Sequence, residues 1–500
     1  MSDQAYQTIA IVIYMAGMLF IGYMAYRRTS DLDDYMLGGR KLHPAAAALS
    51  AGASDMSAWL LLGLPGAIYA AGLVEAWIAV GLTIGAWLNW KFVAPRLRAY
   101  TEVSHNSITI PSFFENRLKD TSHTIRIAAG VIVLVFFTFY VSSGMVAGGK
   151  FFESSFDQNY LTGMFIVAGA TLAYTLFGGF LGATWTDVAQ GTLMLLALIA
   201  VPLVALSDIG GWTAAKDAIL AEDGSVGTTH LSFVAGASFV SILSAAAWGL
   251  GYFGQPHIIV RFMAMRTPQD AKVGRRIGIS WMVLSAVGAV FTGLIGVAYF
   301  NASNATLDDP ETVFLELSQI LFHPLIAGLI LAAVLAAIMS TISSQLIVCS
   351  SALVEDLYNI VGRPLEPKKQ VWLGRAGVLT VAVVAILIAL DPGGSILDLV
   401  GFAWAGFGAA FGPIIILSLY WRGLSRWGAL SGMVAGAVVA FAWGQSSLGD
   451  TLYEIVPGFA TCMIVAVVVS LALKPDNAEI TEEFDAAVKA SGKQPVTTGA

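Results

Sequence analysis

The sequence predicts an all-α integral membrane protein of about thirteen spanning helices, and three observations lead to this fold class. Of the 500 residues, 57% are hydrophobic and only 12% are charged, about half the charged fraction of a soluble protein. Apolar runs of roughly 18 residues or more, long enough to cross a bilayer, recur along the whole chain. Glycine (52) and tryptophan (13) are abundant, as in bundles of closely packed membrane helices with tryptophan at the lipid–water interface.

The expected spans follow one another from the N-terminus. The first, 6–26, is followed by Arg27 and Arg28 and lacks a small-residue cleavage site, which predicts a retained span rather than a signal peptide. Residues 1–474 are expected to form one membrane domain, and 475–500 a polar, partly disordered cytoplasmic tail. The remaining spans are expected near 44–71, 73–94, 124–148, 159–178, 184–207, 232–262, 276–300, 322–354, 372–390, 395–420, 427–445 and 454–473.

The basic residues are distributed unevenly between the two sides of this topology. Of the 26 lysines and arginines, all except Lys150 and Lys216 lie in segments that share one side. The positive-inside rule then places those segments in the cytoplasm, with the C-terminus inside and the N-terminus outside. An error of one span would scramble the segregation, so the distribution also supports the number of spans.

Several classes of protein are disfavoured by the composition. No basic cluster with interleaved aromatic residues suggests a nucleic-acid partner, and no obligatory protein partner is evident beyond the lipid bilayer. Cys349 and Cys462 lie inside apolar runs and are interpreted as core residues, not as a disulfide or metal site. No nucleophile–base pair or metal-ligand spacing occurs within the spans, and His257 stands alone beside Pro256, which disfavours an enzyme.

A first helix break is predicted in the second span. Asp55 lies there, and an ionisable residue inside the membrane indicates function because its burial is costly. The same span contains the helix-weakening residues Gly52, Gly63, Pro65 and Gly66. We therefore expect a discontinuous helix whose backbone oxygens and amides line a site near the bilayer midplane.

A second break is predicted in the seventh span, where Trp248–His257 contains three glycines and one proline. The two breaks occupy matching places in two five-helix sets, near 44–207 and 232–420. Interrupted helices in such positions point to a transporter built from inverted repeats. The alternative for either break alone is a kink required for packing.

The ninth span offers oxygen ligands for a hard cation such as Na⁺. Ala337, Ser340 and Thr341 are spaced to share one helix face. Their oxygens are expected to meet the carbonyls of Ala53 and Met56 on the broken span, and the carboxylate between these two residues would add negative potential. The alternative, which spacing alone favours, is that the hydroxyls bond to their own helix.

Seven sequence stretches are similar to those of a known family. They are Asp33–Tyr35, Leu37–Arg40, Ser50–Ser57, Gly63–Ala67, Trp248–Ile258, Leu346–Ser351 and Ala403–Pro413. In these stretches the chain resembles the sodium/solute symporter family, and within it the bacterial sodium/proline symporters.

The resemblance implies sodium-coupled secondary active import of L-proline by alternating access in a bacterial inner membrane. It implies a leucine-transporter-type fold: two inverted five-helix repeats with one helix before them and two after. It also implies a Na⁺ site, with Asp55 linked to sodium binding. The implied Na⁺ ligands are Ala53, Met56, Ala337, Ser340 and Thr341.

The resemblance further implies a proline site and two polar positions. Arg40 and Asp187 match cytoplasmic-side positions on the ion's exit route, although Asp187 is alternatively a helix N-cap. Aromatic faces suit the proline ring and its ammonium group, with core packing as the alternative role. The implied proline-binding residues are Ser57, Trp59, Tyr140, Trp248, Tyr252 and Pro256.

Two further functions remain open from the sequence. One is sodium symport of a different small solute, such as another amino acid, pantothenate or a sugar. The other is a transporter-like sensor fused to a kinase, which is disfavoured because the tail is too short for such a domain.

Overall fold

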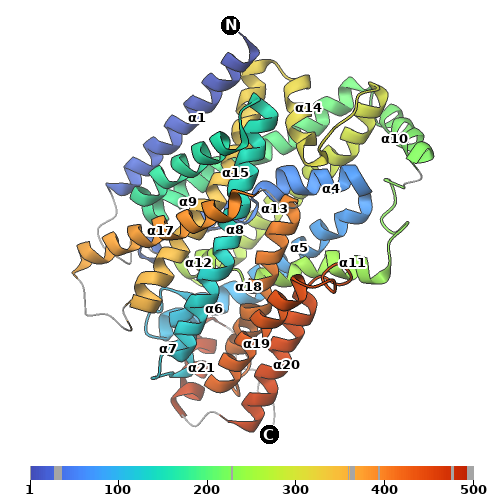
Figure 1. The fold of residues 1–500 in the computed structure, drawn as a ribbon. Helices are drawn as coiled ribbons and strands as arrows, with labels where there is room; N and C mark the ends of the chain where they lie inside the picture. The colour runs from blue at the N-terminus through green and yellow to red at the C-terminus, as the bar shows by residue number, and fades with distance from the viewer. Residues whose placement is uncertain are drawn as a thin grey trace.

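The computed structural model describes residues 2–27, 37–226, 229–358, 360, 366–391, 395–474 and 478–492, and within them the chain is helical (Figure 1). No strand occurs in these ranges, where only an isolated bridge joins Leu42 to Met265. The predicted all-α class is confirmed. The Asp33–Tyr35 stretch of the family resemblance lies outside the described residues.

Ten helices of the described chain are long and apolar enough to cross a membrane, or up to eleven when one bent pair counts as a single span. Two further predicted spans coincide with shorter apolar stretches, Tyr160–Ala173 and Phe239–Phe253. The unbroken spans include α1 (Asp3–Tyr26), α5 (Ala76–Leu88) continuing through η4 (Asn89–Val93) into α6 (Ala94–Val103), α8 (Thr124–Phe156), α13 (Asp270–Ala302), α15 (Pro324–Ser351) with η7 (Ala352–Tyr358), α17 (Pro367–Ala389), α18 (Ile396–Tyr420), α19 (Arg426–Gly444) and α20 (Ile455–Ala472).

Two predicted spans share one helical element. The predicted spans 159–178 and 184–207 belong to a single helical element, α9 (Tyr160–Asp208). Its middle packs against Gly38, whereas Tyr160 at its start bonds to Ala389 and its last residue lies near Tyr299. The element therefore reverses direction near its middle and crosses the molecule twice, as the helices Tyr160–Ala173 and Phe180–Asp208.

Both predicted helix breaks are present. The second span consists of α3 (Pro44–Asp55), the π-helical turn η2 (Trp59–Gly63) and α4 (Leu64–Ala71), and its two halves are bent by 65°. The seventh consists of α11 (Phe239–Ala246), the 3₁₀ segment η5 (Ala247–Phe253) and α12 (Pro256–Ala264). Seven residues is long for a 3₁₀ helix, and such stretches often mark a hinge.

Polar contacts gather on two opposite faces. On the first, the Arg40 guanidinium donates to the carbonyls of Met263 (2.8 Å) and Ser107 (2.7 Å), which joins three segments predicted to share one side. On the second, Lys150 pairs with Glu311 at 2.8 Å. We call these the basic face and the acidic face. Their separation agrees with the two-sided distribution of charge in the sequence.

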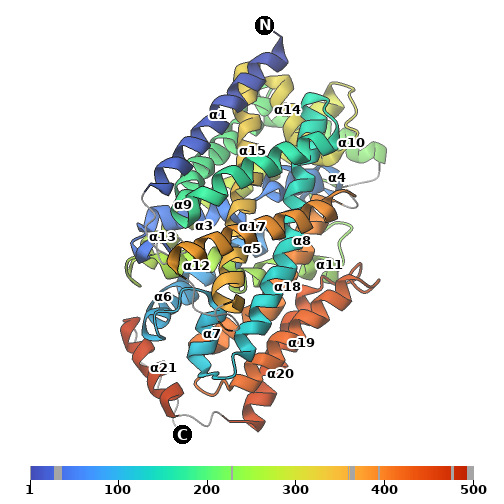
Figure 2. The ribbon, with the colours of Figure 1, turned by 60° about the vertical axis from the view of Figure 1, so that its left-hand side comes forward.

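Four surface helices lie in segments predicted as loops or tail. The tail helix α21 (Ala478–Ala490) packs beside α6 and α7 (Figures 1 and 2), so the expected disorder does not extend to its described part. Its buried residues recur with helical periodicity and form one apolar face: Ile480, Phe484, Ala487 and Val488. The other three surface helices are α7 (Ile110–Leu118), α10 (Trp212–Val226) and α14 (Val313–Leu321).

Candidate ion and substrate site

The first break frees a backbone carbonyl inside the membrane. In a continuous helix, the Ser57 N–H would donate to the Ala53 carbonyl four residues earlier. Here it donates instead to the Asp55 carbonyl at 2.9 Å, around Met56 at φ −79° and ψ 82°. This geometry is an inverse γ-turn. The Ala53 carbonyl thereby loses its helical donor.

A tryptophan fixes the turn in place. The indole N–H of Trp59 donates to the Asp55 carbonyl at 3.1 Å, and the ring is almost completely buried. The Asp55 carbonyl thus accepts from two donors, the Ser57 N–H and the Trp59 indole, and the second bond stabilises the interrupted conformation. The helix resumes at Trp59 as the π-helical turn η2.

The freed Ala53 carbonyl meets the ninth predicted span. Ser340 Oγ lies 2.8 Å from it and 3.1 Å from the Ala337 carbonyl. The alternative that Ser340 bonds to its own helix is thus true in part, because the hydroxyl contacts both helices. Thr341 Oγ1 is buried and has no hydrogen-bond partner among the described residues. The structure therefore brings three of the predicted ligands, Ala53, Ala337 and Ser340, into direct contact. Met56 and Thr341 follow them closely in the sequence.

The carboxylate of Asp55 contacts the second break. Tyr252 donates its hydroxyl to Asp55 Oδ2, while Oδ1 has no partner within the described chain. Both residues line a cavity of about 20 Å³ together with Trp90 and Met282, which is space for about one water molecule. Asp55 therefore connects the first break to the second rather than to Ser340.

The second break is held by a residue that the sequence analysis did not single out for the site. The indole N–H of Trp404, on α18, donates to the Trp248 carbonyl at 2.7 Å. The Trp404 carbonyl accepts from Gln255 Nε2 at 3.0 Å, just before Pro256 opens α12. A Cβ on Gly251 would lie 1.9 Å from the Trp404 indole nitrogen, so only glycine allows this approach. Proline suits the first helical turn, where no N–H is required.

The predicted aromatic residues form one cluster between the breaks. The ring centroids of Trp59 and Trp248 lie 6.5 Å apart, and Tyr252 meets Trp404 edge to face at 5.2 Å. Tyr140, on α8, is buried near Asp55, with its ring 5.8 Å from that of His257. All are positioned by the two interrupted spans or by helices packed on them.

The remaining two predicted substrate residues, Ser57 and Pro256, lie in different parts of the molecule. Ser57 lies in the first break and is buried near Tyr140, although the two make no hydrogen bond. Pro256 lies at the other end of the second break. It lines a separate small pocket toward the basic face, so the structure does not place it within the aromatic cluster.

Asp187 forms a buried ion pair that the sequence did not indicate. It lies inside α9, so the alternative that it caps a helix is wrong. Its Oδ2 accepts from Ser50 Oγ at 2.6 Å and from Arg261 Nη2 at 3.2 Å. Arg261 also donates to Ser344 Oγ at 2.7 Å, which joins α3, α9, α12 and α15. Arg261 lies at the end of a predicted span. Because burying a charge there is costly, its position could have indicated a functional residue. Arg40 lies elsewhere on the basic face and does not meet this pair.

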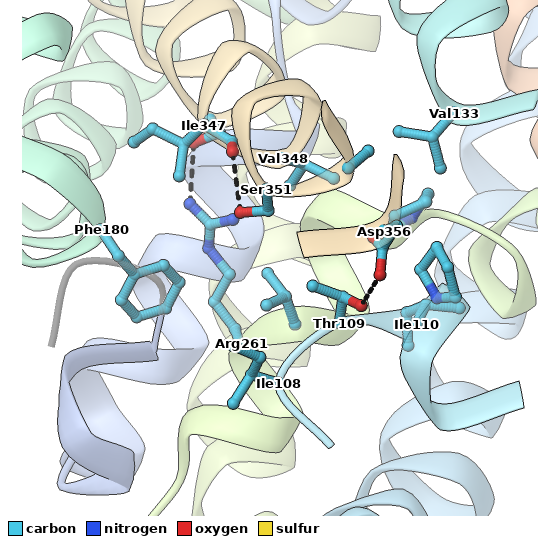
Figure 3. A pocket seen from close by; sticks show the side chains of 15 residues that line it. Ile108, Thr109, Ile110, Val133, Phe180, Arg261, Ile347, Val348, Ser351 and Asp356 are labelled. Atoms are coloured by element: carbon cyan, nitrogen blue, oxygen red, sulfur yellow. Dashed lines mark hydrogen bonds between the residues drawn. The ribbon is translucent and has the colours of Figure 1, made fainter. Parts of the chain in front are cut away.

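Figure 3 shows the small pocket between this ion pair and the basic face. Its volume is about 30 Å³, and Arg261 and Asp356 lie on opposite sides of it. Asp356 accepts from Thr109 Oγ1 at 2.7 Å and from Arg126 Nε at 3.0 Å. Arg126 also pairs with Glu355 at 2.8 Å. These bonds tie α7 and α8 to η7, so the route to the basic face is closed in this structure.

Comparison with known proteins agrees with this architecture. The Sodium:solute symporter family matches residues 35–436. The high-affinity proline transporter PutP of Bacillus subtilis is 54% identical over 469 residues, covering 94% of this chain and 98% of the relative. Sodium/proline symporter 2 of Staphylococcus saprophyticus is 49% identical over 489 residues, covering 95% of both chains.

The fold also matches a solved structure. A Na⁺-coupled sialic acid symporter, described in a substrate-bound outward-open state, superposes with a TM-score of 0.79 at 17% identity. The match covers 94% of this chain and 98% of that one. At this low identity the likeness concerns the fold, and it confirms the predicted leucine-transporter-type arrangement.

Proposed function

The chain belongs to the sodium:solute symporter family, and from this premise we propose that it imports L-proline together with Na⁺ by alternating access. The relatives named as proline transporters support the choice of substrate. The observation that carries the proposal is the 2.8 Å contact between Ser340 Oγ and the Ala53 carbonyl. It brings oxygens from two separate helices together at a break, where a hard cation can bind.

The proposed Na⁺ ligands are the oxygens around this contact. They are the carbonyls of Ala53, Met56 and Ala337 and the hydroxyls of Ser340 and Thr341. The unpartnered Thr341 Oγ1 supports the assignment, because a buried hydroxyl without a partner is unfavourable unless it binds a ligand. The carboxylate of the neighbouring Asp55 adds negative potential without being placed as a ligand.

The proposed proline site lies in the aromatic cluster between the breaks. Proline carries a carboxylate, a secondary ammonium and a small apolar ring. The faces of Trp59, Trp248 and Tyr252 suit the ring and attract the ammonium, and Ser57 and Tyr140 supply hydroxyls. Pro256 acts through the start of α12, whose first N–H groups favour an anion.

Coupling of Na⁺ to proline follows from the hydrogen bond between Asp55 in the first break and Tyr252 in the second. Na⁺ at the Ser340 oxygens holds the broken α3 against α15, and this fixes Asp55 where it accepts the Tyr252 hydroxyl. Tyr252 belongs to the proline site, so each ligand stabilises the geometry that the other needs. The effect is reciprocal: Na⁺ raises proline affinity by the factor by which proline raises Na⁺ affinity. The membrane potential adds about 2.3 kcal/mol per charge per 100 mV.

The orientation and domain organisation belong to the same proposal. The positive-inside rule supports a cytoplasmic basic face, an outer acidic face, an external N-terminus and a cytoplasmic C-terminus in a bacterial plasma membrane. Residues 1–474 then form one transport domain with inverted repeats near 44–207 and 232–420. Arg40 and Asp187 lie on the cytoplasmic side of the ion site, along the proposed exit route.

Uptake of labelled proline tests the proposal. Membrane vesicles containing the protein should accumulate proline when a Na⁺ gradient is imposed and should lose this accumulation when the gradient is collapsed. Excess unlabelled proline should compete, whereas pantothenate and a sugar should not. Accumulation of another solute in place of proline would contradict the substrate, and accumulation that ignores the Na⁺ gradient would contradict the coupling.

A further inference from the structure

A large cavity opens on the acidic face above the aromatic cluster. Its volume is about 650 Å³, compared with about 30 Å³ for the pocket toward the basic face. Trp248 lies at its inner end, where only 7% of the residue is exposed, and Asp55 beyond it is 1% exposed. The cavity therefore reaches the second break but stops at Trp248. We call it the outer vestibule.

Tyr453 closes the vestibule at this point. Its ring stacks on Trp248 with centroids 5.3 Å apart and planes inclined by 22°. Its hydroxyl donates to the Gly401 carbonyl at 2.7 Å, and its backbone N–H donates to Ser244 Oγ at 3.1 Å. Gly401 belongs to α18 and Ser244 to α11, so one residue bridges two walls of the vestibule while covering the inner tryptophan.

Tyr453 is held from a segment beyond both proposed repeats. It lies in the connection between α19 and α20, where the Trp443 indole N–H donates to the Leu452 carbonyl at 2.9 Å. This bond fixes the turn immediately before Tyr453. The Tyr453 ring thus lies between α19 and α20, outside both proposed repeats, whereas the Trp248 ring that it covers belongs to the second break.

The charge of the vestibule favours cations at this closure. The described residues that line it include no lysine or arginine, and four carboxylates are among them: Glu75, Asp398, Asp450 and Glu454. Carboxylates in a low-dielectric cleft raise the local concentration of cations. Sodium ions and the ammonium end of an amino acid are therefore drawn toward the Tyr453–Trp248 pair.

From this arrangement we infer that Tyr453 is the outer lid of the proline site, separating from Trp248 to admit the substrate and stacking on it again after entry. The inference rests on the proposed function, because it takes the cluster behind Trp248 to be the substrate site. Tyr453 is a positioning residue in this role. Its ring covers Trp248, and its hydroxyl only secures the ring to α18.

Access to the buried first break tests the lid. A single reporter cysteine at Ser57→Cys, in a chain with Cys349→Ala and Cys462→Ala, is labelled by a membrane-impermeant maleimide added to either side of the membrane. Removing the ring with Tyr453→Ala should accelerate labelling from the vestibule side about tenfold, which is the scale of one aromatic stacking contact. Tyr453→Phe keeps the ring and loses only the hydroxyl bond to Gly401, so it should accelerate labelling less than Tyr453→Ala does.

A matched tyrosine controls for general loosening. Tyr420 lies at the other end of α18, and its hydroxyl donates to the Phe92 carbonyl at 2.9 Å. Tyr420→Ala should leave the labelling rate unchanged. The lid is refuted if Tyr453→Ala labels at the parental rate or if Tyr420→Ala accelerates labelling equally. Proline uptake by the unmodified protein is measured separately, so failure of the proposed transport and failure of the lid give different results.

Discussion

Replacing Ser340 with alanine tests the ion site at its most defined contact. The change removes one hydroxyl, whose oxygen lies 2.8 Å from the Ala53 carbonyl and 3.1 Å from the Ala337 carbonyl. Helix α15 is regular at this point, and alanine favours the helix, so the backbone should be retained. The lost hydroxyl is one of five proposed Na⁺ ligands and the direct link between α15 and the first break.

The magnitude follows from the type of interaction removed. A polar group that interacts with a charged partner contributes about 1.5–3 kcal/mol. Each 1.4 kcal/mol corresponds to a factor of about ten in an equilibrium constant. The Na⁺ concentration for half-maximal proline uptake should therefore rise about 10- to 150-fold. Because coupling is reciprocal, the KM for proline should also rise when Na⁺ is limiting, and it should recover at high Na⁺.

Initial rates of proline uptake across a Na⁺ series provide the assay. Ser318→Ala is the matched control, because Ser318 is also buried and its hydroxyl bonds only to the Phe314 carbonyl of its own helix, at 2.6 Å. It should leave the Na⁺ dependence unchanged. The reasoning is refuted if Ser340→Ala shows the parental Na⁺ dependence, or if both variants shift it equally.

Three further changes test the remaining features. Asp55→Asn should raise the Na⁺ requirement by more than about tenfold, since an intramembrane charge is lost; unchanged sodium activation would remove Asp55 from the mechanism. Trp248→Ala should raise the proline KM about tenfold through lost ring and cation–π contacts; a fall in expression alone would make it a packing residue. Asp356→Asn weakens the bond to Arg126, 3.0 Å away, while Arg126 keeps Glu115 and Glu355, so the free energy of unfolding should fall by about 1.5 kcal/mol. Glu366→Gln, in an exposed ion pair, should have little effect, and equal melting temperatures for these two variants would contradict the last prediction.

The helix breaks could be predicted because their causes are local. Glycine and proline weaken a helix wherever they occur, and they are dense in 52–66 and 249–256. Spacing placed the candidate oxygens of the Ser340 group on one face but alone favoured hydroxyls bonded to their own helix, and only the family resemblance implied that they meet Ala53. The γ-turn at Met56, which frees the carbonyl, depends on the Trp59 side chain folding back, and spacing alone did not reveal that.

The partners of the site could not be predicted from local patterns. Trp404 and Tyr453 approach Trp248 from segments more than 150 residues away, and only the packed structure shows that they meet. Arg261 carried a usable signal as a charge at the end of a span, but its pairing with Asp187 depends on how α9 and α12 pack. The hydrophobic pattern located both crossings of α9, but it records lipid crossing alone and could not show how tightly the two crossings are joined.

The position of Asp55 explains how an ion and an amino acid can be coupled without sharing a ligand. Its backbone carbonyl holds the turn that frees the Ala53 oxygen, while its carboxylate accepts the Tyr252 hydroxyl across the other break. A displacement of the first break by Na⁺ must therefore move the anchor of Tyr252 as well. Because interrupted helices have few internal hydrogen bonds to resist such movement, the coupling energy is concentrated where the backbone is least constrained.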